Sequence, residues 1–184
     1  EGTELFAKND LFYSRRIGAT PSGYNSVAAE LDTNEKIEEN PSVTRLYNAM
    51  KISGRTPKKL GLGFLNAISV PAYAVVKDTV TGETREVLTE AISDYNMLVI
   101  DKILKNNSYI GFFNSAVVRA GSPRDADVSS VQFRAGNKKN TYAVEGYGDV
   151  SQVFYPGATN GAYRGYRYNL TAGKVSGKFT ALAR

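Results

Sequence analysis

The carboxylates of Glu145 and Asp149 are the side chains whose spacing comes closest to an acid–base pair. The two residues lie four positions apart in a predicted strand, so both carboxylates project from the same face. At the rise of a strand their separation is roughly 13 Å, which exceeds the roughly 5 to 9.5 Å between the carboxyl groups of glycosidases. We therefore interpret both as charges lining an interior, paired with Arg134 or Lys174, and we expect no catalysis.

Histidine and cysteine are both absent from the sequence. The chain therefore has no histidine-dependent catalytic triad, no thiolate zinc site and no disulfide framework. Segment 21–41 gathers carboxylates that would suit a calcium ion, but it lacks the ligand spacing of an EF-hand. A solvated loop with a helical turn near residues 27–31 is the favoured interpretation, so we expect no metal and no cofactor.

Arg15 and Arg16 are candidate binding residues because they are adjacent in a predicted strand, 11–18. Successive side chains of a strand point to opposite faces, so one arginine must turn inward, toward carboxylates or carbonyl groups. The alternative is a surface strand with two solvated arginines. The sequence leaves both interpretations open.

Tyrosines gather around a predicted loop at residues 156–161. They are Tyr155, Tyr163, Tyr166 and Tyr168. Aromatic rings beside a Gly/Asn-containing loop can stack on sugar rings, but tyrosines also form girdles at membrane–water boundaries. The girdle or simple loop packing is the favoured interpretation, and a glycan site is the alternative.

A predicted hairpin at residues 128–153 positions most of these side chains. Its first strand alternates Val131 and Phe133 with Gln132 and Arg134, and a turn of Gly, Asn and Lys residues follows at 136–140. A period of two places Arg134 and Gln132 on one face and Phe133 and Val131 on the other. One face of the hairpin thus requires water and the other an apolar medium.

Segments 44–56 and 60–70 repeat this plan as a second hairpin. Leu46, Met50 and Ile52 are predicted on its apolar side. Asn48 and Asn66 fall on the same side, where an unpaired amide in hydrocarbon would cost about 2 kcal/mol or more. A register change at a β-bulge would remove this conflict.

The remaining segments complete an antiparallel meander. Pro71 limits its strand to an edge, a bulge or an end near Val70. Segment 86–105 is predicted as a strand from about Tyr95, with a short preceding helix as the alternative. The whole chain is predicted to be all-β, with about seven or eight long strands. It forms one domain or a fragment of one, with an N-terminal strand and polar loop (1–43) and a β-meander (44–184).

Composition narrows the possible partners. The chain has 184 residues, 42% of them hydrophobic, and a net charge of +5 that is spread along the sequence and forms no basic block. Specific nucleic-acid binding is therefore not expected. No apolar run approaches the roughly 20 residues of a spanning helix, so a membrane role would have to use strands of about 9 to 11 residues.

Several short motifs of the chain resemble those of a known family. They lie at residues 1–6 (Glu-Gly-x-x-Leu-Phe), 12–18 (Phe-Tyr-Ser-Arg-Arg-Ile-Gly), 49–55, 107–111 and 142–146 (Tyr-Ala-Val-Glu-Gly). Together they resemble the outer-membrane barrel domain of unknown function that follows a family 9 carbohydrate-binding-like module in large exported bacterial proteins. The block 12–18 is the most specific of them. The resemblance implies an antiparallel β-barrel in a Gram-negative outer membrane and a link to glycan capture, and it supplies no catalytic residues.

Two departures from that family lead us to expect an internal piece of the barrel. No binding module precedes residue 1, and the sequence ends at Ala183-Arg184, where a complete barrel closes on an aromatic residue. The leading hypothesis is a segment of an outer-membrane-type β-barrel that contacts the lipid bilayer and acts as a conduit or surface anchor. The alternative is a soluble β-sandwich or barrel that binds glycan through the tyrosine-rich loop. Strand number, ligand and oligomeric state are not determined by the sequence.

Overall fold

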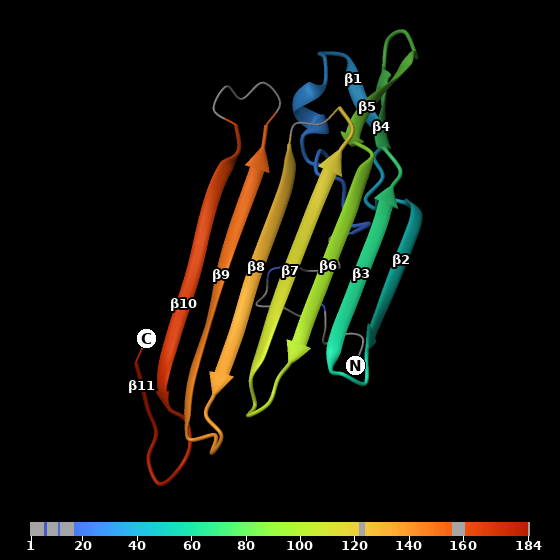
Figure 1. Cartoon of the computed structure of the whole chain (residues 1–184). Helices are drawn as coiled ribbons and strands as arrows, with labels where there is room; N and C mark the ends of the chain where they lie inside the picture. The colour runs from blue at the N-terminus through green and yellow to red at the C-terminus, as the bar shows by residue number, and fades with distance from the viewer. Residues whose placement is uncertain (1–5, 7–10, 12–16, 122–123, 156–160, 184) are drawn as a thin grey trace.

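Two antiparallel sheets make up the computed structural model, which describes residues 6, 11, 17–121, 124–155 and 161–183 (Figure 1). The large sheet has the order β11-β10-β9-β8-β7-β6-β3-β2, and the small sheet has the order β1-β4-β5. The strands of the large sheet are β2 (Leu46–Arg55), β3 (Leu60–Ser69), β6 (Ser93–Ile103), β7 (Tyr109–Arg119), β8 (Asp125–Gly136), β9 (Tyr142–Phe154), β10 (Tyr163–Lys174) and β11 (Ala181–Ala183). Those of the small sheet are β1 (Glu35–Glu39), β4 (Ala72–Asp78) and β5 (Thr84–Glu90).

The expected all-β class and antiparallel meander are confirmed. Strands β2, β3 and β6 to β10 are each 10 to 13 residues long, and from β6 onward each pairs with the next strand in the chain. The links at 104–108 and 137–141 are short, as the antiparallel arrangement allows. Among the described residues, no helix has the length and apolar character needed to cross a bilayer.

The β4–β5 hairpin departs from a simple meander because it leaves the large sheet and forms the small one. Strand β3 ends at Ser69, and β4 begins at Ala72, just past Pro71. Proline has no N–H to donate to a ladder, so the expected strand end near Val70 is confirmed. Strand β6 then returns beside β3, and Figure 1 shows the small sheet at one end of the long strands.

Two local expectations have different outcomes. The helical turn near residues 27–31 is confirmed as a 3₁₀-helix, Val27–Glu30, whereas β1 at Glu35–Glu39 was not expected in the acidic loop. The helix alternative for 86–105 is wrong, because this segment forms the end of β5 and the whole of β6. The strand expected from about Tyr95 is therefore confirmed within β6, in keeping with the β-branched Val99 and Ile100.

The large sheet has two chemically different faces. The charged face is the one that carries the ion pairs Arg55–Asp101, Arg134–Glu145 and Arg167–Asp149. The apolar face is the one that carries the cross-strand row Leu62, Ile100, Phe112 and Val131. The predicted alternation of the 128–153 hairpin is confirmed, with Val131 and Phe133 on the apolar face and Gln132 and Arg134 on the charged face.

Apolar packing occurs in two separate clusters. On the charged face, Phe6 packs with Met97, Val99 and Phe113, and Leu11 packs against the same cluster. The second cluster joins Val27, Ala74, Val76 and Val87, and it fixes the 3₁₀-helix on the small sheet. The apolar face of the large sheet has no comparable cluster of buried residues among those the structure describes.

Candidate functional site

The apolar face is the most unusual surface of the molecule. Leu62, Ile100, Phe112 and Val131 are 46%, 37%, 37% and 47% exposed, although they are direct cross-strand neighbours. Monomers in water rarely expose contiguous apolar patches of more than a few hundred Å². This face is therefore the candidate surface for contact with an apolar medium or a partner.

Further rows extend the apolar face on both sides of that row. Ile52, Phe64 and Leu98 form one row, and Ile110, Phe133, Gly146 and Leu170 form another. Tyr166 and Tyr168 belong to the same face, since Tyr168 lies opposite Gly148 and Gly148 lies opposite Val131. The rows cross every long strand, so the apolar face is a band rather than a local patch.

A hydrogen-bonded polar row borders this band. The Nδ2 of Asn66 donates to Oδ1 of Asp94 at 2.7 Å and to Oδ1 of Asn96 at 3.0 Å. The Nδ2 of Asn114 donates in the same way to Oδ2 of Asp127 at 2.6 Å and to Ser129 at 3.0 Å. Each asparagine thus pairs with an aspartate and a second polar group on an adjacent strand.

The bulge that was expected to move Asn48 and Asn66 off the apolar face acts on another residue. It lies between Leu46 and Asn48, so Leu46 pairs with Ser69 and turns to the charged face. The placement of Leu46 beside Met50 and Ile52 was therefore wrong. Asn48 and Asn66 stay on the apolar face, and hydrogen bonding, not a register change, satisfies the amide of Asn66.

The ion pairs of the charged face use the predicted carboxylates. Glu145 pairs with Arg134 directly across strands β8 and β9, and Asp149 pairs with Arg167 at 2.7 Å across β9 and β10. The expected partner Lys174 instead lies over the ring of Phe179, 3.6 Å from its centroid. Both carboxylates are therefore on one face, as predicted, and each is neutralised by an arginine of a neighbouring strand.

The carboxylates of the two ion pairs differ in how deeply they are buried. The side chain of Asp149 is 5% exposed, whereas that of Glu145 is 44% exposed. A buried charge depends on its partner far more than a solvated one does. Sequence spacing gave no sign of this difference, because it comes from how deeply each position lies under its neighbours.

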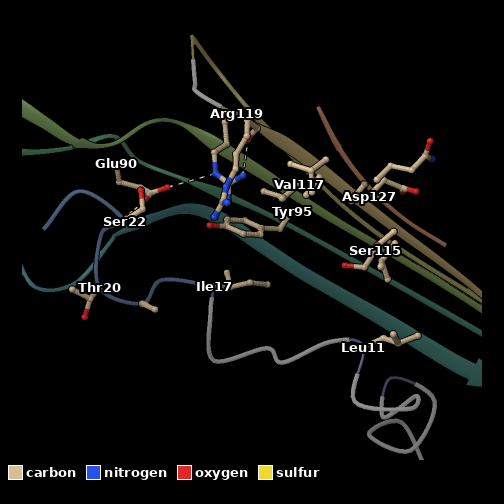
Figure 2. Close-up of a pocket in the computed structure, with 18 residues that line it drawn as sticks. Leu11, Ile17, Thr20, Ser22, Glu90, Tyr95, Ser115, Val117, Arg119 and Asp127 are labelled. Carbon is tan, nitrogen blue, oxygen red and sulfur yellow. Dashed lines mark hydrogen bonds and ion pairs between the residues drawn. The ribbon is translucent and has the colours of Figure 1, made fainter. Parts of the chain in front are cut away.

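A cavity of about 640 Å³ lies between residues 17–22 and the charged face (Figure 2). Figure 2 shows Ile17 and Thr20 on one side and Ser115 and Val117 on the other. Its polar corner holds Glu90, which was not predicted. That corner depends on residues far apart in the sequence, so no local motif marked it.

The carboxylate of Glu90 is held from several directions. It accepts a hydrogen bond from the backbone N–H of Ser22 at 2.6 Å, and its other oxygen lies 3.8 Å from Nε of Arg119. Nη1 of Arg119 in turn donates to the carbonyl of Arg124 at 2.9 Å. These contacts close the corner of the cavity and tie residues 17–22 to the large sheet.

The predicted tyrosines do not form one site. Tyr166 and Tyr168 project from the apolar face of β10, whereas Tyr163 follows the opposite alternation. Tyr155 and Tyr163 contact each other edge to face, with ring centroids 5.5 Å apart. Arg15 and Arg16 lie outside the described residues.

An ion pair joins the outer strands β1 and β5 of the small sheet. Arg85 donates to both oxygens of Glu35, at 2.7 and 2.6 Å, and the N–H of Asp32 donates to the same carboxylate at 2.9 Å. The Arg85 hydrogen bonds, with that N–H, lower the pKa of Glu35 to about 2. Within the described part of the chain, no group of three His, Cys, Asp or Glu side chains is arranged to hold a metal ion.

Comparison with known proteins gives one match. A family described as "Domain of unknown function (DUF5916)" matches residues 1–184. No curated protein and no solved structure matches the chain.

Proposed function

The chain belongs to the DUF5916 family, and we propose that it forms a lipid-facing part of an outer-membrane-type β-barrel. In this proposal the barrel serves as a conduit or a surface anchor in the outer membrane of a Gram-negative bacterium. The observation that carries it is the exposed apolar band, which crosses every long strand of the large sheet. A bilayer is the medium that such a band fits.

The height of the band supports a bilayer. Its rows run from Ala135–Val144 through Ile110–Phe133 and Phe112–Val131 to Phe64–Leu98, in steps of two residues. Three steps of roughly 6.6 Å give about 20 Å, which is close to the ~25 Å apolar band of outer-membrane barrels. The hydrogen-bonded groups of Asn66 and Asn114 lie at this end of the band, with Asn114 directly opposite Leu98 of the last row, and a membrane–water boundary would lie there.

The charged face supports a water-facing or protein-covered interior. Its carboxylates are paired with arginines, and Phe6 covers part of it. Barrels in lipid also require closed edges, because unpaired N–H and C=O groups in hydrocarbon are costly. The proposal therefore requires that β2 and β11, the edge strands of the described sheet, pair with further strands.

The role proposed is not catalytic. The candidate acid–base pair is Glu145 and Asp149. Each forms an ion pair with an arginine, as expected of a structural ladder of charges. The partner proposed is the lipid bilayer, without nucleic acid.

A pair of arginine substitutions on neighbouring residues tests the proposal. Phe133→Arg places a cation on the apolar face, and a mid-bilayer arginine on a lipid-facing strand costs about 2 to 4 kcal/mol. Gln132→Arg places the same cation one residue away on the charged face. We expect Phe133→Arg to abolish folding into phospholipid vesicles, measured by protease protection, while Gln132→Arg folds like the parent chain.

Two results would contradict the membrane role. Equal folding of both variants into vesicles would show that Phe133 does not face lipid. A parent chain that is monomeric without detergent and melts cooperatively would show that the apolar face needs no bilayer.

Glycan capture is a second candidate, favoured by the edge-to-face pair Tyr155–Tyr163. Sugar rings stack on exposed aromatic faces. In this case oligosaccharides should shift the tyrosine emission of the parent chain, and Tyr163→Ser should remove the shift. No shift with the parent chain would exclude this candidate.

A further inference from the structure

The lysines of the large sheet are concentrated at one end of its strands. The turns that join β2 to β3, β6 to β7, β8 to β9 and β10 to β11 carry Lys58, Lys59, Lys105, Lys138, Lys139 and Lys178. We refer to these six residues as the lysine rim. The same turns contain no Asp or Glu, so every charged side chain in them is positive. Figure 1 shows the four turns together, at the end opposite the small sheet.

The lysine rim differs from the arginines in its contacts. Arg55, Arg85, Arg119, Arg134 and Arg167 all form ion pairs with carboxylates of the same chain. Among the described residues, no carboxylate pairs with a lysine of the rim, and all six lysines are exposed. Their charge is therefore directed to the surroundings of the molecule.

The backbone conformation at Lys59 shows that the turn between β2 and β3 does not require a lysine there. Its φ is 62°, a left-handed conformation that the chain otherwise assigns to asparagine or glycine, as at Asn106, Asn107 and Asn140. Asparagine adopts this conformation more readily than lysine does. The lysine at this position adds a charge, and it does not help the turn.

The lysine rim directly follows the apolar band. Lys102, at the end of β6, lies opposite Leu60 on one side and Ile110 on the other, both on the apolar face. Its Nζ reaches past the strand end to the carbonyl of Lys58. Such an aliphatic stem along apolar surface, with its ammonium beyond the edge, is the arrangement of lysines at a membrane boundary.

The opposite ends of the strands carry acidic side chains beside arginines such as Arg119 and Arg164. The polar row places Asp94 and Asp127 on the apolar face there, and Asp125 begins β8. The small sheet adds the acidic residues of β1. The charge is thus asymmetric along the strands, so the two ends of the sheet suit different surroundings.

We propose that the lysine rim binds the phosphate layer of an anionic phospholipid leaflet and so sets which end of the sheet lies at that leaflet. This inference rests on the proposed membrane function and extends it by naming the lipid headgroup. An anionic surface attracts each basic side chain within a Debye length, and the effects of several lysines accumulate. The continuity of the rim with the apolar band favours a lipid phosphate over a soluble anion.

Vesicle flotation of the full chain tests this proposal. The parent chain is added to vesicles of phosphatidylcholine alone and to vesicles in which part of that lipid is replaced by phosphatidylglycerol. The test variant is K58Q/K59N/K138Q/K139Q, in which asparagine at 59 suits the left-handed turn. The matched control is K36Q/K77Q/R45Q/R164Q, which removes the same charge from the opposite end and from the small sheet.

We expect the parent chain to favour the anionic vesicles at low salt and to lose this preference at high salt. The rim variant should lose on the order of a hundredfold in its association with anionic vesicles. It should still associate with phosphatidylcholine, and the control should keep the preference of the parent chain.

The other outcomes overturn the proposal in distinguishable ways. If the parent chain associates equally with both kinds of vesicle, the lysine rim does not bind anionic lipid, and the proposed membrane function still holds. An equal loss in the control would show a net-charge effect without a defined surface. Failure of the parent chain to associate with either vesicle would overturn the membrane function and this inference together.

Discussion

The aromatic ring of Phe6 packs directly on Gly63. A Cβ added to Gly63 would lie 2.9 Å from Cζ of Phe6, closer than a side chain can approach without a shift. Met97, Val99 and Phe113 surround the same ring, and Nζ of Lys51 lies 4.6 Å from its centroid. The glycine of β3 thus makes room for an aromatic residue more than fifty positions earlier in the chain.

Gly63→Ala should destabilise the fold through this contact, by about 1 to 3 kcal/mol. Phe6→Ala removes the ring from its cluster and should cost about 3 kcal/mol. In the double variant the added methyl meets no ring, so the alanine at 63 should cost little. Denaturant unfolding of the four proteins in a double-mutant cycle measures this coupling. Additive losses would mean that Phe6 does not occupy this position.

Asn66→Leu should destabilise the fold although it makes the apolar face more apolar. The substitution leaves Asp94 without its 2.7 Å donor, and the loss of a hydrogen bond to a charged group costs about 1 to 3 kcal/mol. Asn48→Leu is the control, since Asn48 makes no side-chain hydrogen bond to the described residues and lies on the same face. Unfolding free energies in detergent should separate the two variants. A gain in stability from Asn66→Leu would refute the role of the polar row.

Arg167→Ala should be more costly than Arg134→Ala. Removing Arg167 leaves Asp149, only 5% exposed, as an uncompensated buried charge, at a cost of about 3 kcal/mol. Removing Arg134 leaves Glu145, which is 44% exposed and can be hydrated, so that loss should stay below about 1 kcal/mol. Denaturant midpoints of the two variants measure the difference. The reverse order would mean that the burial of the two carboxylates is misassigned.

The small sheet should lose stability in acid through Glu35. Its pKa is about 2 in the folded chain, against an ordinary value of 4.5, so folding favours the ionised carboxylate. The resulting stabilisation is complete above pH 4.5 and disappears as the pH falls toward about 2. Amide hydrogen exchange in β1 and β4, followed across this window, should show the loss. Arg85→Gln should flatten the pH dependence, and an unchanged profile in that variant would exclude the ion pair as its cause.

Alternation along each strand was the property that could be predicted from the sequence. Because side chains alternate along a strand with a period of two, Val131 and Phe133 must lie on one face and Gln132 and Arg134 on the other, whatever the neighbouring strands are. Pro71 likewise specifies a strand end without any tertiary information. The all-β class, the long strands and the common face of Glu145 and Asp149 follow from this local chemistry.

Cross-strand register decided what the local pattern could not. The sequence marked Asn66 as an isolated amide on an apolar face, and only pairing with β6 brings Asp94 and Asn96 to it. The bulge at Leu46 could have acted at either asparagine, and its position follows from how β2 pairs with β3.

Residues far apart in the chain define the remaining features. Phe6 meets Gly63, Glu90 meets Ser22, and Arg85 meets Glu35 only because the chain folds back across the charged face and the small sheet. The amino-acid sequence by itself thus determined which side chains share a face along an unbroken strand. The tertiary structure alone decided which of them are neighbours, because register and long-range packing depend on the strands that pair and not on spacing within one strand.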